Sequence, residues 1–133
     1  YMAAFITNAS DLATNYVFVD SCATHHMTGQ KINFVKESDA STRVYFGDMA
    51  SGCKVTEIGK KTFKLNAGKY EHTIGFSGFY FCEGLDKDLL SMRLLLEKGF
   101  YVDMENLRLY LPNSWTYFRM QWVYNLLALQ VFH

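Results

Sequence analysis

The sequence predicts a small, mainly β domain, either a barrel or a sandwich, and three observations support this. Short segments rich in aromatic and β-branched residues recur along most of the chain, as is typical of strands. Turn residues separate these segments at short intervals. Half of the 133 residues are apolar, which is enough to bury one core.

The N-terminal part predicts one buried strand between polar segments. Residues 1–15 are mixed in polarity and predict an arm or an edge strand. The short apolar run Tyr16–Val19 predicts a buried strand. A turn or short helix is expected over His25–Gly29, and a polar loop over Lys36–Thr42.

The middle of the chain predicts a series of hairpins. A strand over Arg43–Phe46 leads into a hairpin tip at Gly47–Gly52, and a further turn is expected at Asn66–Gly68. Between and after these turns, β-type segments are expected at Cys53–Ile58, Thr62–Leu65, Tyr70–Ile74 and Gly75–Phe81.

One short helix is expected at about residues 88–98. Asp88 stands where it could cap the helix, apolar residues recur on one side, and Gly99 follows as a stop. Two more strands are expected at Tyr101–Met104 and Leu107–Leu111.

Residues 112–133 form an aromatic tail. After Glu105 the only Lys, Arg, Asp or Glu residues are Arg108 and Arg119. A large apolar segment is expected to pack on the domain, bind a partner or touch a membrane. The tail does not span a membrane, because its apolar runs are shorter than roughly 20 residues, and we expect no membrane partner. A strand and an amphipathic helix from Arg119 onward both remain open.

Charge and cysteine content limit the functional classes. Thirteen basic and thirteen acidic residues give zero net charge, so no nucleic-acid partner is expected. Cys22, Cys53 and Cys82 are widely spaced without a CxxC pair, and an odd count fits a secreted disulfide framework poorly. Cys53 and Cys82 are expected to be small core residues. With no visible signal peptide, a reduced cytoplasmic setting is expected.

Asp20 is the sharpest candidate for chemistry, because it follows a hydrophobic strand and precedes small residues. The segment VFVDSCATHHMTG, from Val17 to Gly29, resembles the active-site loop of the aspartic peptidases of copia-type LTR retrotransposon Gag-Pol polyproteins. Within residues 16–111, further segments resemble that family in the same order: Val44–Asp48, Val55–Lys60, Gly84–Ser91 and Leu95–Phe100.

The resemblance implies a retropepsin-like acid-protease barrel over residues 16–111, flanked by the arm and the tail. It also implies a homodimer that cleaves a polyprotein or peptide substrate between two Asp20 carboxylates. Such carboxylates share a proton, so one accepts a proton from water while the other donates to the peptide carbonyl. No metal and no cofactor is needed. The expected location is the cytoplasm or a virus-like particle.

The same resemblance assigns supporting roles around Asp20. The active-site loop continues through Ser21, Cys22, Ala23 and Thr24, and the Ser21 hydroxyl would bridge the protomers. A hairpin at about residues 47–59 would close over the substrate as a flap. Its candidate residues are Gly47, Asp48, Met49 and Gly52.

Several positions depart from the family pattern. Cys22 and Met49 stand at positions that are usually glycine, Glu57 where glycine is common, and Glu83 replaces the usual proline. A side chain at position 22 would crowd the dimer axis. Two functions therefore stay open: an active homodimeric aspartic endopeptidase, and a degenerate or host-recruited copy that is inactive and binds a protein partner through the tail or the old dimer face.

The residues of this loop do not favour a metal site or a catalytic thiol. Cys22, His25 and His26 lie in one loop without a fourth ligand, whereas zinc takes four well-spaced donors, so no metal site is expected. A catalytic Cys22 thiol would need a positioned histidine. Both histidines are instead expected to hydrogen-bond backbone near the loop. A solvated strand face is expected for Lys60, Lys61 and Lys64.

Overall fold

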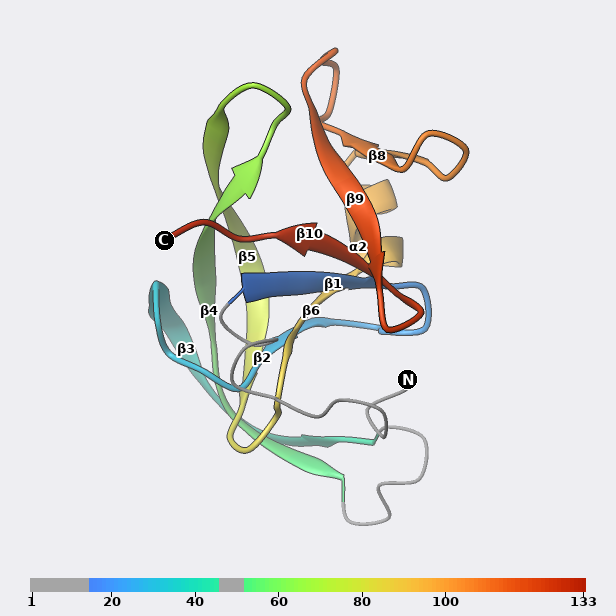
Figure 1. Ribbon diagram of the computed structural model, residues 1–133. Coiled ribbons are helices and arrows are strands. Elements are labelled where there is room, and N and C mark those ends of the chain that lie inside the picture. The colour runs from blue at the N-terminus through green and yellow to red at the C-terminus, as the bar shows by residue number, and fades with distance from the viewer. Residues whose placement is uncertain (1–14, 46–51) are drawn as a thin grey trace.

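The computed structural model describes residues 15–45 and 52–133, and these parts are mainly β with one short helix, as predicted (Figure 1). Most of the expected N-terminal arm lies outside them. The described strands are β1 Tyr16–Asp20, β2 His26–Thr28, β3 Phe34–Val44, β4 Cys53–Asn66, β5 Glu71–Cys82, β6 Asp88–Ser91, β7 Tyr101–Asp103, β8 Arg108–Tyr110, β9 Tyr117–Val123 and β10 Leu126–Gln130. The helix α2, Met92–Glu97, follows β6 directly. The described strands form one sheet in the order β3-β4-β5-β2-β6-β1-β10-β9-β8-β7.

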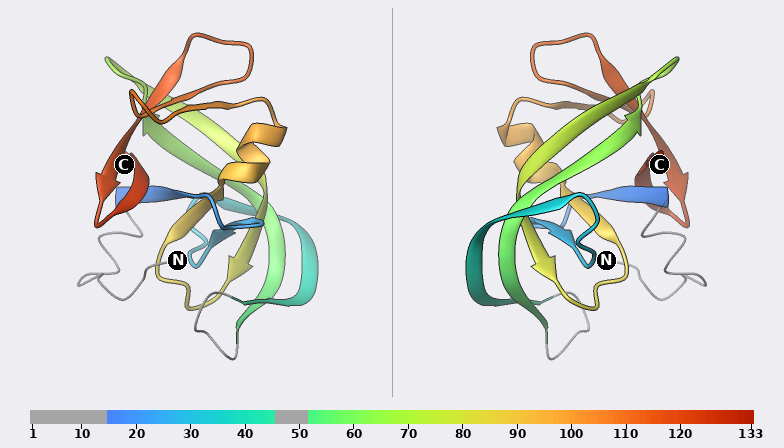
Figure 2. Two further views of the ribbon diagram at one scale, coloured as in Figure 1. Left: turned by 90° about the vertical axis from the view of Figure 1, so that its right-hand side faces the viewer. Right: turned by 90° about the vertical axis from the view of Figure 1, so that its left-hand side faces the viewer.

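Two long neighbouring strands, β4 and β5, form the body of the sheet. Figure 2 shows them as curved ribbons that run along the molecule. β3 pairs with β4 over its whole length, with register shifts that mark bulges. The expected loop over Lys36–Thr42 is wrong, because these residues belong to β3. Most of the side chains of β3 are exposed, so its polar composition is compatible with a strand.

Three short strands in the centre of the sheet position the candidate site. β6 pairs in parallel with β1 and antiparallel with β2, and lies between them. The chain leaves β1 at Asp20, crosses the end of β6 and returns as β2. The turn or short helix expected over His25–Gly29 is therefore wrong for His26–Thr28. All three residues of β2 are buried between β5 and β6, and pairing with these neighbours stabilises the extended conformation.

The helix begins later than the sequence suggested. Residues Asp88–Ser91 are all buried in the sheet as β6, so the expected cap at Asp88 is wrong. Ser91 caps α2 instead, because its Oγ accepts a hydrogen bond from the Leu94 N–H at 3.3 Å. Gly99 follows the helix with φ of 92°, a conformation that favours glycine, as expected for a helix stop.

The aromatic tail contributes two strands to the main sheet. β9 and β10 form a hairpin, and β10 pairs antiparallel with β1. Of the two open alternatives for this segment, the strand is correct. Phe118, Leu127 and Leu129 are buried in the main core, which explains much of the tail's apolar composition. Trp115 remains 91% exposed.

The core is divided into two clusters on opposite faces of β1. Val17 and Val19 pack into the larger cluster with Phe63, Phe79 and residues of β9 and β10. Phe18 points the other way, into the smaller cluster. A bridge between Leu65 and Val131 also brings the chain after β10 against β4. Within the described residues, no helix has the length and apolar character needed to cross a membrane.

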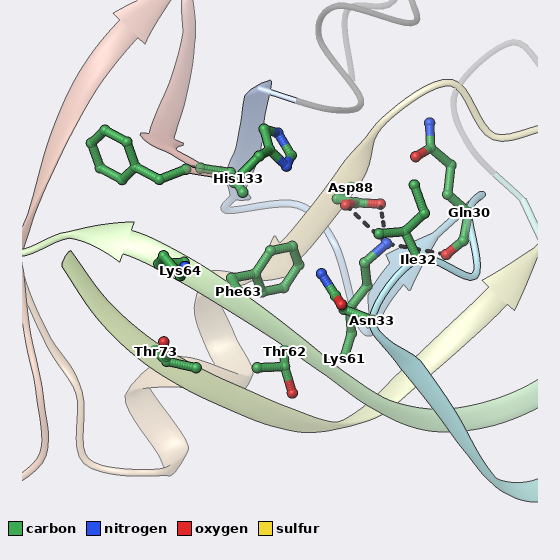
Figure 3. A pocket seen from close by; sticks show the side chains of 12 residues that line it. Gln30, Ile32, Asn33, Lys61, Thr62, Phe63, Lys64, Thr73, Asp88 and His133 are labelled. Carbon is green, nitrogen blue, oxygen red and sulfur yellow. Dashed lines mark hydrogen bonds and ion pairs between the residues drawn. The ribbon is translucent and has the colours of Figure 1, made fainter.

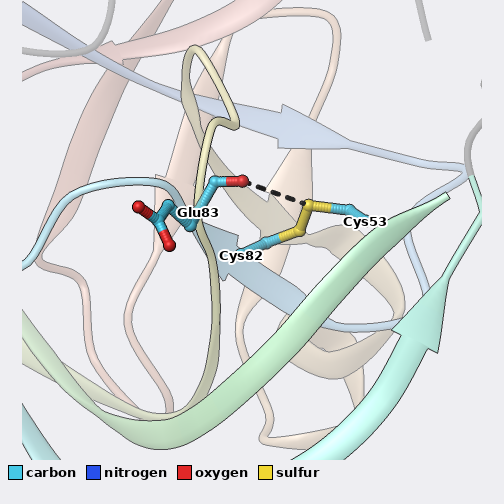
Figure 4. The surroundings of a disulfide bond; sticks show 3 residues. All are labelled: Cys53, Cys82 and Glu83. Atoms are coloured by element: carbon cyan, nitrogen blue, oxygen red, sulfur yellow. Dashed lines mark hydrogen bonds between the residues drawn. A yellow bond between two sulfur atoms is a disulfide. The ribbon is translucent and has the colours of Figure 1, made fainter.

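A disulfide joins Cys53, at the start of β4, to Cys82, at the end of β5 (Figure 4). Their Cα atoms are 5.9 Å apart, a normal separation for a disulfide. Both residues belong to the smaller core cluster, as predicted. The bond itself was not predicted, because pairing of β4 with β5 brings together cysteines 29 positions apart.

Candidate functional site

Asp20 ends β1 and lines a cavity of about 410 Å³. Its Oδ1 accepts a hydrogen bond from the Cys22 N–H at 2.8 Å, an Asx turn that leads the chain out of the strand. Asp20 is only partly buried. Most other side chains around the cavity are apolar, including Phe18, Leu89, Met92, Met104, Trp122 and Leu126. A carboxylate at this edge can exchange protons with a molecule that enters the cavity.

The loop that follows Asp20 is held from two other elements. Ser91 Oγ, at the end of β6, donates a hydrogen bond to the Ala23 carbonyl at 2.7 Å. Arg93 Nη2, on α2, donates to the Thr24 carbonyl at 3.1 Å. Ser21 and Cys22 are exposed, and Cys22 is a free thiol. The described contacts thus fix the backbone at Ala23 and Thr24 and leave the Ser21 and Cys22 side chains at the surface.

His26 is buried directly beneath this loop. Its Nδ1 accepts a hydrogen bond from the Ser91 N–H at 2.9 Å, which confirms the expected backbone contact and places the ring proton on Nε2. The ring packs on Phe79 at a centroid distance of 5.2 Å and edge-on to Phe76 at 5.9 Å. Burial, followed by the charge of His25, lowers the pKa of His26 to about 4. His26 is therefore neutral near pH 7.

His25 has different surroundings. Its Nδ1 lies 3.0 Å from Thr24 Oγ1, a side-chain partner rather than the backbone partner expected. Its ring stacks on Tyr80 at 4.2 Å. Burial, followed by the charge of Arg93, lowers the pKa of His25. Within the described residues, no three His, Cys, Asp or Glu side chains are placed to hold a metal ion.

The predicted flap is described only in part. Gly47, Asp48 and Met49 lie outside the described residues. Gly52 has φ of 69°, and a Cβ there would lie 2.9 Å from the Val44 carbonyl oxygen. Only glycine fits this close approach without a shift.

A second polar cluster, which the sequence did not predict, surrounds the start of β6 (Figure 3). Lys61 Nζ lies 3.2 Å from Asp88 Oδ2, and both side chains are only 4% exposed. Lys61 also donates to Thr28 Oγ1 at 2.8 Å and to the Gln30 carbonyl at 3.1 Å. The expected solvated position is wrong for Lys61, although Lys60 and Lys64 are exposed.

This cluster is a structural connection rather than an anion site. Burial lowers the pKa of Lys61 and raises that of Asp88, and the opposite charge of each partner counters the shift. The three ammonium hydrogens have acceptors on Thr28, Gln30 and Asp88, so none is left for an anion in the adjoining cavity of about 260 Å³. The signal in the sequence was that Lys61 shares the inward alternation of Phe63 and Leu65.

Residues 17–100 match the family described as "Pol polyprotein, beta-barrel domain". The chain belongs to this family. The matched segment contains Asp20 with its loop, the buried His26, the buried pair of Lys61 with Asp88, and α2. The match identifies the chain as a domain derived from a retroelement Pol polyprotein. β10 lies beyond the matched segment, although it pairs with β1 inside it. No curated protein and no solved structure matches the chain.

Proposed function

We propose that the domain is a homodimeric aspartic endopeptidase of a copia-type retrotransposon polyprotein, with Asp20 as its catalytic residue. The observation that carries this proposal is the position of Asp20. This residue ends β1, begins the loop that leads to β2, and lines a largely apolar cavity. Membership of the Pol polyprotein family supports a polyprotein as the substrate.

The reaction requires a second carboxylate, because one group cannot act as acid and base in the same step. Two protomers related by a two-fold axis supply it. Carboxylates in contact share one proton. The ionised Asp20 takes a proton from water as the water oxygen bonds to the peptide carbonyl carbon, and the protonated one donates to the carbonyl oxygen. The C–N bond then breaks as the amine takes up a proton. This mechanism uses no metal or cofactor.

Cys22 decides how closely the two loops can approach. Its side chain is exposed beside Asp20, so it is not packed in the core of its own protomer. In the dimer the same side chain stands near the axis. We therefore expect Cys22→Gly to strengthen dimerisation and to raise kcat/KM for peptide cleavage.

Peptide hydrolysis tests this function directly. Peptides that span the junctions of the parent polyprotein are incubated at pH 5 with dimer confirmed by sedimentation. We expect cleavage by the native chain and by Cys22→Gly, and its loss in the nearly isosteric variant Asp20→Asn. Failure of a confirmed Cys22→Gly dimer to cleave any junction peptide would contradict the proposal.

Exposed aromatic side chains in the tail favour a second candidate function, binding of a protein partner by an inactive copy. Trp115 is 91% exposed and Trp122 is 56% exposed. In this case Trp115→Ser with Trp122→Ser would abolish binding of the purified partner, and Asp20→Asn would leave binding unchanged. Loss of peptide cleavage in Asp20→Asn together with unchanged partner binding in the tryptophan variant would favour the peptidase.

A further inference from the structure

Ser91 joins the candidate catalytic loop to the rest of the fold. It is the register partner of Asp20 in the parallel pairing of β1 with β6, and it is fully buried. Its Oγ donates to the Ala23 carbonyl at 2.7 Å and accepts from the Leu94 N–H at 3.3 Å. Its own N–H donates to His26 Nδ1 at 2.9 Å. These three hydrogen bonds require Ser91 to stay in one position. The bond from its N–H to His26, on β2, helps to hold it there.

The contact between His26 and Ser91 exists only while Nδ1 carries no proton. Protonation would place an N–H donor against the Ser91 N–H donor, and a buried N–H without an acceptor is costly. The ring cannot easily turn away, because it stacks on Phe79 and meets Phe76 edge-on. The repulsion is therefore relieved by movement of Ser91, which also holds Ala23.

We propose that neutral His26 is a positioning residue that holds Ser91, and through Ser91 the loop carrying Asp20, and that protonation of His26 releases this loop. The clamp is a property of the folded chain. Its effect on catalysis by Asp20 rests on the proposed function.

Burial favours the neutral form of His26, and the charge of His25 adds to this effect. His25 immediately precedes β2, and Arg93 on α2 holds the same loop at Thr24. The ion pair of Lys61 with Asp88 meets β2 at Thr28 and carries no net charge. β5 presents the uncharged rings of Phe76 and Phe79, and Ser91 is the neighbour from β6. With its pKa near 4, His26 stays neutral at the pH 5 of the peptidase assay.

Amide hydrogen exchange in Asp20→Asn protein tests the clamp without any peptidase activity. If the released loop returns His26 to its usual pKa of 6.5, linkage predicts that Ser91 protection falls by about 80-fold between pH 6.5 and pH 4. The opening is local, so Ser91 is expected to be less protected at every pH than Leu109, whose amide lies on the remote strand β8. The amide shifts of Ala23 and Thr24 should follow the same pH dependence.

Two matched variants separate the clamp from general destabilisation. In His26→Gln the side-chain carbonyl can accept the Ser91 N–H without titrating, so the pH dependence of Ser91 protection should disappear. His25→Gln should retain it. If His26→Gln shows the native pH dependence, or if Ser91 and Leu109 are equally protected at every pH, the clamp is wrong.

The activity measurement distinguishes this inference from the proposed function. In a variant that cleaves peptide, kcat/KM is expected to fall at low pH, and protonation of His26 should account for one step of that fall. His26→Gln should remove this step, whereas His25→Gln should keep it. Absence of cleavage in every background contradicts the peptidase and leaves the exchange result to decide the clamp. Cleavage with an acid limb that is unchanged in His26→Gln contradicts the clamp alone.

Discussion

Lys61 and Asp88 are the buried ion pair that connects β4 to β6. Burial lowers the pKa of Lys61 and raises the pKa of Asp88, and the opposite charge 3.2 Å away counters each shift. Such a pair adds little net stability compared with an apolar pair of similar volume. Removal of only one partner is different, because it leaves an uncompensated charge in the core.

We expect Lys61→Met to lower the free energy of unfolding by about 3–5 kcal/mol at pH 7. The double variant with Asp88→Leu should recover most of this loss, because no buried charge remains. Lys64→Met, at an exposed position of the same strand, should change stability by less than about 0.5 kcal/mol. Urea denaturation measures all three. A double variant as unstable as Lys61→Met would contradict this interpretation.

His26 should make the stability of the whole domain sensitive to acid. Its folded pKa of about 4 lies below its unfolded value of 6.5. The unfolded chain therefore binds more protons in this range, and stability falls as the pH drops from 6.5 toward 4, by up to about 3 kcal/mol. The unfolding free energy of the native protein minus that of His26→Gln should be lower at pH 4.5 than at pH 7 by most of this amount. Parallel pH curves would exclude the linkage.

At the scale of elements, local patterns predicted β1, the middle hairpins and the end of α2. β1 is recognisable because Val17, Phe18 and Val19 are all apolar and buried. β2 was missed because burial by β5 and β6, rather than its own composition, makes it a strand. The start of α2 was misplaced for the same reason. Asp is a residue type that often caps helices, but Asp88 is buried in β6, where it pairs with Lys61.

The candidate site was predicted only as far as it is contiguous in sequence. Asp20 and the loop to Thr24 follow one another, so a local motif identifies them. Ser91, in β6, and Arg93, in α2 directly after it, reach this loop because β6 pairs with β1 and β2 over long sequence separations. The sequence therefore singled out Asp20 as a candidate and missed the side chains that hold its loop.

The disulfide between Cys53 and Cys82 should stabilise the β4–β5 pair. Closing a loop over a separation of 29 residues is expected to contribute about 3–4 kcal/mol in the chain-entropy account. We expect reduction, or Cys53→Ala with Cys82→Ala, to lower the free energy of unfolding by that amount in urea denaturation. Cys22→Ser should have little effect, because that thiol is free and exposed. An unchanged midpoint after complete reduction would contradict this expectation.

At the scale of the whole molecule, the sheet depends on its C-terminal strands. β10 is the partner of β1 on the side opposite β6, so β1 is a central strand only while the tail is present. The tail buries Phe118, Leu127 and Leu129 in the same core as Val17. The segment that carries the family match thus needs residues beyond position 100 to complete its core.

Truncation after Leu111 should therefore unfold the domain. It removes β9 and β10 and exposes one edge of β1 together with the core beneath it. We expect the truncated chain to lose dispersed amide signals in NMR and cooperative melting, whereas Trp115→Ser keeps both because that side chain is exposed. Cooperative unfolding of the truncated chain would show that the tail is dispensable.

Assembly is the remaining question at this scale, because one protomer supplies a single Asp20. A crystal structure of the dimer, with a non-cleavable peptide bound, tests it most directly. We predict a two-fold axis between the Asp20 loops and the two carboxylates about 3 Å apart, sharing one proton. A dimer formed elsewhere, with the Asp20 carboxylates far apart, would contradict the peptidase assignment.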